Sequence, residues 1–151
     1  MNSKSNGNIG EAVILAEFTR YGIQCSIPWG DNARYDLIAE FNGKLNKIQI
    51  KYCDAKISEN DSYVCSVSSS TNHTTNKKLT DYSNDVDYIA IYIKPWNKCL
   101  LIPISFCGSR KTITFRNGTP KNKQIKKINY SDDFLFSKIL CVETLHDQPK
   151  P

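Results

Sequence analysis

The stretch RYDLIAEFNGKLNKIQIKY, residues 34–52, decides the fold of this 151-residue chain. Residues 35–41 and 45–52 are rich in apolar and β-forming side chains, and the Asn42-Gly43 pair between them is the strongest short signal for a hairpin turn. We therefore predict two antiparallel strands joined by a tight turn.

Side chains alternate across a strand, so the second arm of this hairpin has two chemically different faces. Gln49 and Lys51 point to one face, while Ile48 and Ile50 point to the other and can enter the core. Asp36 and Gln49 each lie six residues from the nearer turn residue, which makes them near-opposite partners. The pairing brings a carboxylate, an amide and an ammonium group together.

This combination of side chains suits the hydrolysis of a phosphodiester. The reaction needs oxygen ligands that hold Mg²⁺ against the phosphate, a group that activates or orients water, and positive charge for the developing phosphorane. Asp36, the Gln49 side-chain oxygen and the Ile50 carbonyl can form the oxygen shell, and Lys51 can orient water or stabilise charge on the phosphate. Glu11, in the first predicted helix, can complete or support this metal site.

A plainer interpretation exists for each of these residues. Asp36 can simply end a turn, Gln49 and Lys51 can form the solvated face of an ordinary strand, and Glu11 can be an acid favoured by the helix dipole. For any single residue the plainer interpretation is preferable, and only the joint pattern favours a catalytic site.

Outside the hairpin, the spacing of apolar residues predicts one helix followed mainly by strands. Ile9, Ala12, Val13 and Ala16 recur at near-helical spacing, with Asn8 able to cap the start and Gly22 acting as the stop. Strands are predicted at 23–28, 63–68, 86–93, 99–104 and 111–116, a loop at 68–78, a short helix capped by Asp132 or Asp133, and a disordered tail at 147–151.

The charge balance makes an anionic partner plausible. The chain carries 20 Lys+Arg against 15 Asp+Glu, a net charge of +5, and its length fits one domain rather than two. Residues 109–130 contain seven basic residues and no acid. This stretch is a candidate phosphate-contacting surface, although a face kept basic for solubility explains it equally well.

The cysteines and the N-terminus indicate a cytoplasmic protein. Most of the six cysteines lie in apolar strand-like runs, no CxxC pair occurs, and neither His73 nor His146 has zinc-site spacing to a cysteine pair. We expect reduced, mainly buried thiols and no structural zinc. Residues 1–10 are polar and no apolar run approaches a membrane span, so we expect neither a secretory signal nor a membrane partner.

An ordered set of motifs resembles the PD-(D/E)XK nuclease superfamily, and most of all the bacterial group I intron-encoded homing endonucleases built on the restriction-enzyme fold. The resemblance spans residues 7–105, and its motifs are Gly10-Glu11, Arg34-Tyr35-Asp36-Leu37-Ile38, Asn42-Gly43, Ile48-Gln49-Ile50-Lys51, Asp87-Tyr88-Ile89-Ala90-Ile91-Tyr92 and Leu101-Ile102-Pro103-Ile104.

The resemblance implies a fold, a reaction and an assembly. The expected fold is an α/β restriction-endonuclease-like core with a mixed central sheet flanked by helices over residues 1–105, followed by a basic extension over 106–151 that contacts DNA or a second subunit. The expected activity is Mg²⁺-dependent, site-specific cleavage of double-stranded DNA by a dimer or tetramer, with Mn²⁺ able to replace Mg²⁺ and Ca²⁺ able to bind without supporting cleavage.

Two positions depart from the family pattern. Arg34-Tyr35 stands where the family name has proline, and Gln49 stands where the usual motif has Asp or Glu. A neutral amide should weaken metal binding unless Glu11 compensates for the missing charge.

Two segments offer groups for holding DNA, in addition to Arg34 beside the predicted site. The 68–78 loop and the basic segment are suited to base edges and phosphates, and their plainer interpretations are a flexible loop and a solvated extension or subunit contact. The residues concerned are Ser69, Ser70, Asn72, His73, Lys77, Lys78, Arg110, Lys111, Arg116, Lys121 and Lys123.

Three further side chains are left out of the predicted chemistry. A nuclease that uses Lys51 and a metal does not need His73 as a general base. Trp29 and Trp96 could stack on bases, but both adjoin turn residues, and we expect them to pack against a sheet edge.

The sequence thus favours a homing endonuclease and leaves two kinds of rival open. A restriction or repair nuclease, or a junction resolvase, would use the same core. A DNA-binding module whose metal site has decayed would explain the neutral Gln49.

Overall fold

The computed structural model of the chain describes residues 2–30, 32–58, 61–69, 81–118 and 127–144. It contains the predicted hairpin, and the two strands pair in the predicted register. Its arms are β2 (Leu37–Phe41) and β3 (Lys44–Cys53), paired antiparallel with Leu37 opposite Ile48. Asn42 and Gly43 have φ angles of 57° and 63°, the left-handed conformation that a two-residue turn of this type requires at both positions.

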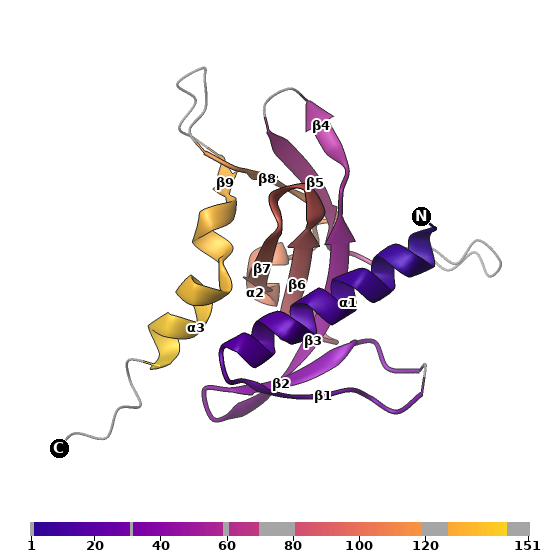
Figure 1. The fold of residues 1–151 in the computed structure, drawn as a ribbon, viewed down its shortest axis with the longest axis vertical. Helices are drawn as coiled ribbons and strands as arrows, with labels where there is room; N and C mark the ends of the chain where they lie inside the picture. The colour runs from indigo at the N-terminus through magenta and orange to yellow at the C-terminus, as the bar shows by residue number, and fades with distance from the viewer. Residues whose placement is uncertain (1, 31, 59–60, 70–80, 119–126, 145–151) are drawn as a thin grey trace.

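The hairpin belongs to a mixed five-stranded sheet, as predicted (Figure 1). The strand order is β1-β2-β3-β6-β7, and only the β3–β6 pair is parallel. The three further strands are β1 (Gln24–Ser26), β6 (Tyr88–Ile93) and β7 (Lys98–Pro103), and the single 3₁₀ turn η1 (Lys94–Trp96) connects the last two. The sheet is the platform that carries β3 and its polar side chains.

A second, four-stranded sheet lies over one face of the first. Its order is β4-β5-β8-β9, formed by β4 (Lys56–Ser58), β5 (Ser62–Ser66), β8 (Thr112–Arg116) and β9 (Asn129–Tyr130). The sequence predicts β5 and β8 as strands but not their pairing, because that contact joins segments far apart in the chain. The remaining elements are α2 (Ile104–Cys107), η2 (Ser131–Phe134) and α3 (Phe136–Thr144).

The first helix, α1 (Ser3–Arg20), begins earlier than predicted. Asn2, not Asn8, is its N-cap, and the Asn2 side chain accepts a hydrogen bond of 2.8 Å from the Ser5 backbone N–H. The first turns of α1 are polar and largely exposed, so apolar periodicity could not detect them. The predicted stop is confirmed: Gly22 follows the helix with a φ of 71°.

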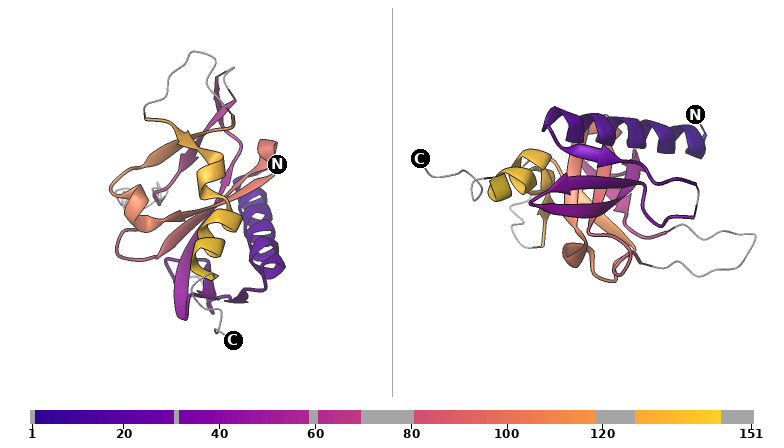
Figure 2. Two further views of the ribbon diagram at one scale, coloured as in Figure 1. Left: turned by 90° about the vertical axis from the view of Figure 1, so that its left-hand side faces the viewer. Right: turned by 90° about the horizontal axis from the view of Figure 1, so that it is seen from below.

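The two faces of the five-stranded sheet are covered by different elements (Figure 2). Ile48 and Ile50 pack with Ile14 and Phe18 of α1, which confirms that this face of β3 enters the core. The other face packs against the second sheet, through a core that includes Ile89, Ile91, Ile93, Cys65, Leu100, Ile113 and Phe115. Gln49 and Lys51 lie on this second face, because side chains alternate along β3.

The segment after residue 105 contributes to both cores. Phe115 of β8 is fully buried between the sheets, and Phe136 at the start of α3 meets Phe18 of α1 edge to face at 4.7 Å. The division into a core over 1–105 and an extension over 106–151 stays a prediction.

Five cysteines are described with their side chains, and all of them are free thiols, Cys53, Cys65 and Cys107 being buried. None of the described helices combines the length and apolar character needed to cross a bilayer.

Gly10 lets α1 approach β3 closely, and a pair of glycine substitutions tests this contact. A Cβ on Gly10 would lie 3.3 Å from the Tyr52 Cβ, whereas a Cβ on Gly7, one turn earlier, would meet nothing within 4 Å. We expect Gly7→Ala to stabilise the protein by about 0.5–1 kcal/mol through helix propensity. Gly10→Ala should lower stability, because overpacking costs about 1–3 kcal/mol. Urea unfolding of both variants measures the difference, and equal gains would contradict the close approach.

Candidate active site

The Asp36 carboxylate lies where β2 begins, directly beside β3. The hairpin register carries Asp36 opposite Gln49, and one oxygen, Oδ2, accepts hydrogen bonds from the Gln49 Nε2 at 2.5 Å and the Ile50 backbone N–H at 2.7 Å. The Asp36 backbone N–H donates to the Ile48 carbonyl at 2.9 Å. The predicted juxtaposition of Asp36 and Gln49 is therefore present, and Oδ1 is left for another partner.

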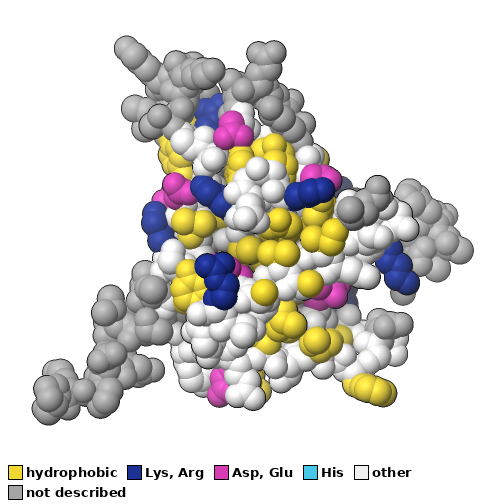
Figure 3. Space-filling view, in the orientation of Figure 1, with side chains coloured by type: hydrophobic (Ala, Val, Ile, Leu, Met, Phe, Trp, Pro, Cys, Tyr) yellow, Lys and Arg dark blue, Asp and Glu magenta, His cyan; other side chains and the backbone are white. Residues whose placement is uncertain are grey.

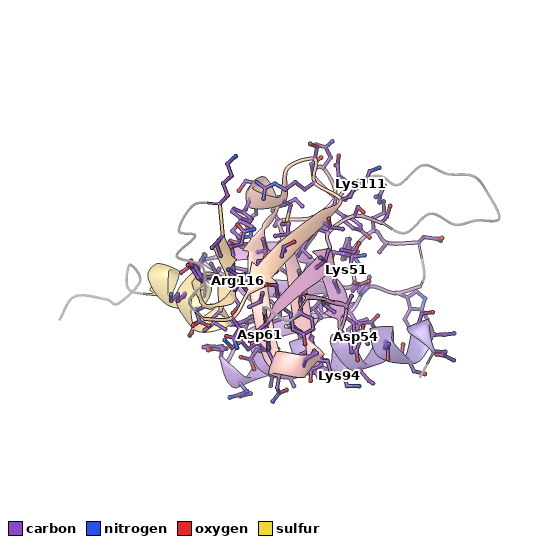
Figure 4. The ribbon with its side chains drawn as sticks, turned by 90° about the horizontal axis from the view of Figure 1, so that it is seen from above. Lys51, Asp54, Asp61, Lys94, Lys111 and Arg116 are labelled. Atoms are coloured by element: carbon purple, nitrogen blue, oxygen red, sulfur yellow. The ribbon has the colours of Figure 1, made fainter. Side chains whose placement is uncertain are left out.

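Lys51 projects from the same face of β3 as Gln49 into a largely buried position (Figure 4). Its ammonium group donates to the Tyr82 hydroxyl at 3.2 Å and lies 5.0 Å from the centroid of the Tyr82 ring. Burial lowers the pKa of Lys51, while the negative charge of Asp36 acts in the opposite direction. The electrostatic coupling shows that the two charged groups face the same space.

Glu11 reaches this space from the other side of the sheet. α1 covers the face of the sheet that Ile48 and Ile50 occupy. Glu11 of this helix lies near Asp36 at the edge of the sheet where β2 begins. Both acids line a hollow of about 370 Å³, together with residues 27, 28, 30, 33 and 35. Burial raises the pKa of Glu11, and the charge of Asp36 raises it further. The pKa of Asp36 is also raised, by burial first, with the Ile50 N–H, Lys51 and Gln49 opposing.

The sequence did not reveal Tyr82. It lies in a turn between residues 81 and 86, yet its side chain is buried, and its hydroxyl contacts Lys51 from 31 positions away in the chain. The Arg34 guanidinium lies 5.4 Å from the centroid of the Tyr82 ring and forms an ion pair of 3.3 Å with Asp85. No local pattern in the sequence could identify the contact of Tyr82 with Lys51, because only the folded chain brings the two segments together.

The donor set fits a hard cation such as Mg²⁺. Mg²⁺ in proteins is commonly held by one or two carboxylates together with substrate phosphate oxygens and water. Glu11 and Asp36 supply two carboxylates, and Gln49 and Ile50, which hydrogen-bond to Asp36 through their N–H groups, carry the amide and backbone oxygens that could add to them. Within the described ranges no group of three or more His, Cys, Asp or Glu side chains gathers as a metal site, so the uncharged oxygens would have to contribute.

Only part of the predicted DNA-contacting set lies within the described residues. Arg110, Lys111 and Arg116 flank or belong to β8, where Figure 4 shows Lys111 and Arg116 at opposite ends of the strand. Arg110 and Arg116 line a hollow of about 360 Å³ on the second sheet, and the Arg116 Nε donates to the Ser62 hydroxyl at 3.4 Å. Ser69 is half-buried. The predicted residues outside the described ranges are Ser70, Asn72, His73, Lys77, Lys78, Lys121 and Lys123.

Basic side chains do not form one continuous patch on the face shown in Figure 3, where Lys and Arg side chains are interspersed with Asp and Glu. Some of the basic groups are paired with acids, as in Lys44–Asp87 at 2.7 Å and Lys98–Asp132 at 2.7 Å. The described residues of this face thus carry charges of both signs.

The two tryptophans differ. Trp96 packs edge to face against Tyr63 at 4.8 Å, as predicted. For Trp29 the prediction of packing against a sheet edge is wrong, because its side chain is fully exposed in the connection between β1 and β2. Neighbouring turn residues do not reveal whether a tryptophan folds back onto the protein.

Comparisons with known proteins match this architecture. The sequence model of the PD-(D/E)XK endonuclease family matches residues 1–137. The fold is similar to the structure of a bacterial homing endonuclease, I-Ssp6803I, with a TM-score of 0.74, 20% sequence identity and coverage of 100% of both chains. No curated protein matches the sequence.

Proposed function

The chain belongs to the PD-(D/E)XK endonuclease family, and from that premise we propose that it is a site-specific, Mg²⁺-dependent homing endonuclease that cuts both strands of DNA. The family assignment makes it a nuclease that acts on DNA. The homing role, the choice of Mg²⁺ and the active-site residues named below are the proposal.

One observation carries the assignment of the site. A single hairpin places the Asp36 carboxylate against the Gln49 amide and the Ile50 N–H, with the largely buried Lys51 ammonium electrostatically coupled to the same carboxylate. An ordinary exposed strand has no reason to bury a lysine beside an acid whose own pKa is raised by burial.

Each residue of the proposed site has a different role in the reaction. Asp36 Oδ1, the Gln49 Oε1, the Ile50 carbonyl and Glu11 would hold Mg²⁺, which when bound supplies positive charge to the scissile phosphate and acidifies its water ligands. The hydrogen bonds that Asp36 Oδ2 accepts from Gln49 and Ile50 fix the orientation of the carboxylate. Lys51 would orient the attacking water or stabilise the negative charge that develops on the phosphate.

Double-strand cleavage requires two such sites, so we propose that the chain acts as a dimer or tetramer. The basic residues flanking and within β8, Arg34 beside the active site, and the predicted residues of the 68–78 loop would contact DNA. The similarity in fold to a bacterial homing endonuclease motivates the homing role, and a restriction or repair nuclease or a junction resolvase with the same core is the alternative that the genomic setting separates from it.

The genomic setting supplies the test of the homing role. If the gene lies inside an intron, the joined flanking sequences give the expected target. Incubating a plasmid that carries this target with protein and Mg²⁺ should linearise it, Mn²⁺ should substitute, and Ca²⁺ should support binding alone. Sustained binding without nicking in either Mg²⁺ or Mn²⁺ would instead identify a DNA-binding module without activity.

Tyr82 should act as a positioning residue for Lys51. Tyr82→Phe removes the hydroxyl that accepts the 3.2 Å hydrogen bond and leaves the ring in place. We expect the single-turnover cleavage rate to fall about 10- to 150-fold with unchanged affinity for DNA, since the loss of one hydrogen bond to a charged group costs about 1.5–3 kcal/mol. Tyr92→Phe is the control, because it removes a hydroxyl bonded to Asn97 at 3.1 Å and distant from Lys51. Equal cleavage by both variants would exclude a positioning role.

The raised pKa values of Asp36 and Glu11 predict the acid limb of the pH profile. Because burial raises the pKa of both carboxyls, each takes up a proton at a higher pH than an exposed carboxyl of its type, and a protonated carboxyl does not ligate metal. Cleavage should therefore fall as the pH drops, and higher Mg²⁺ concentrations should move the limb to lower pH. Single-turnover cleavage rates measured as a function of pH at several Mg²⁺ concentrations test this. The prediction is contradicted if the pH at which the rate falls does not change with Mg²⁺ concentration.

A further inference from the structure

Trp29 is the most exposed large apolar side chain in the described part of the chain. Its relative accessibility is 103%, and that of Ile27, two residues earlier, is 71%. Trp96 by contrast packs on Tyr63, and its indole N–H donates to Asp61 at 2.7 Å. The Trp29 indole therefore contributes almost no buried area to the fold, although burial of an aromatic side chain is strongly favourable.

The position of Trp29 links it to the candidate active site. The connection between β1 and β2 extends beyond the sheet (Figure 1), and its residues 27, 28, 30 and 33 line the hollow that contains Glu11 and Asp36. Gly30 has a φ of +80°, a conformation suited to glycine, which turns the chain directly after the tryptophan. Pro28 and Gly30, on either side of Trp29, both line the hollow, so the tryptophan is attached to the chain at its rim, with its side chain in solvent.

The negative charge in the hollow bears on how DNA can be held beside it. Two acids, Glu11 and Asp36, line it together, and their carboxylates repel a phosphate until a cation joins them. An indole next to these acids can bind DNA without positive charge, because every base presents a π face on which the indole can stack.

We propose that Trp29 stacks on a base of the bound DNA beside the scissile phosphate, an inference that rests on the proposed nuclease function. The base is either unpaired or at a step that the indole opens as an apolar wedge. Trp29 then supplies binding free energy that does not depend on salt or on Mg²⁺.

Fluorescence tests the contact in the full chain. The sequence has two tryptophans, so Trp96→Phe leaves Trp29 as the sole fluorophore. Titration with a mixed-sequence DNA duplex in EDTA at low ionic strength should quench its emission and protect it from acrylamide, because a stacked indole contacts the base and is shielded from solvent. Unchanged emission at saturating DNA would overturn the proposal.

Affinity measurements in the otherwise unmodified chain give a second test. Trp29→Ala should weaken DNA binding by about 5- to 150-fold, the loss expected for one stacked base, and Trp29→Phe should restore most of it. Leu45→Ala is the control, because Leu45 is a 63% exposed apolar residue near the hairpin turn at the far end of β2 from Asp36. Equal loss in Leu45→Ala would mean that exposed apolar area, not stacking, sets the affinity.

Salt dependence separates stacking from charge. The slope of log affinity against log salt concentration should be unchanged in Trp29→Ala, whereas Arg116→Ala should reduce its magnitude by about one if it contacts a phosphate. A reduced slope in Trp29→Ala would contradict an uncharged contact.

The outcomes distinguish this inference from the nuclease function. DNA binding and fluorescence quenching in EDTA require no cleavage. If the protein cuts DNA in Mg²⁺ but the Trp29 emission is not quenched by DNA, only the stacking proposal is wrong. A protein that binds and quenches but never cuts refutes the activity instead. If Trp29→Ala lowers the mass measured by sedimentation, Trp29 is a subunit contact and the stacking proposal is wrong.

Discussion

Asp36→Asn should reduce the single-turnover rate of DNA cleavage by about 10³-fold while DNA affinity in EDTA stays at the wild-type value or increases. The substitution removes the negative charge that would hold Mg²⁺ but keeps an oxygen able to accept from Gln49 and the Ile50 N–H, as Oδ2 does now. The loss of rate would therefore report the charge and not a collapsed hairpin. Glu40→Gln is the matched control, because Glu40 is an exposed acid on the same strand.

Asp36→Asn should not lower the stability of the folded protein near neutral pH, although it lowers the cleavage rate. Burial raises the pKa of Asp36 in the folded protein, so its contribution to stability is present at acid pH and is lost as the pH rises and the carboxyl ionises. The neutral asparagine should make the folded state at least as stable as wild type near neutral pH, with the difference shrinking at acid pH. A clear loss of thermal stability at neutral pH would show that the ionised carboxylate has a structural role.

Lys51→Ala should lower the cleavage rate by about 10²- to 10³-fold, the effect expected when one charged donor to the reacting phosphate is removed. DNA affinity should change little, because Lys51 is largely buried and bonded to Tyr82 within the protein. The comparison variant is Lys47→Ala: Lys47 lies on the same face of β3, is exposed, and rests over the Tyr35 ring at 5.5 Å. Rapid-quench cleavage assays with excess protein measure both, and equal rates would refute the role of Lys51.

The hairpin and its polar face could be predicted because their determinants are local. Asn42-Gly43 fixes the turn, the turn fixes the register, and the register places Asp36 beside Gln49. Strand alternation then separates Ile48 and Ile50 from Gln49 and Lys51 without knowledge of the rest of the molecule.

The remaining features depend on contacts between distant segments. The pairing of β5 with β8 joins residues 62–66 to 112–116, and no local pattern specifies that partner. The approach of Glu11 to Asp36 depends on how α1 docks on the sheet, which the missing side chain of Gly10 permits. No prediction was made for Tyr82, and Trp29 was expected to pack against a sheet edge because it adjoins turn residues. Turn composition does not determine whether an aromatic ring is buried or exposed.

The central claim is that Asp36, Gln49, Ile50 and Glu11 form a metal site next to Lys51. A crystal structure of the protein bound to DNA in Ca²⁺, which supports binding without cleavage in this account, tests it most directly. We predict a calcium ion about 2.3–2.6 Å from the Asp36 carboxylate and the Ile50 carbonyl, with a phosphate oxygen on its open side. A calcium ion bound elsewhere on the protein, with the scissile phosphate away from Asp36, would contradict it.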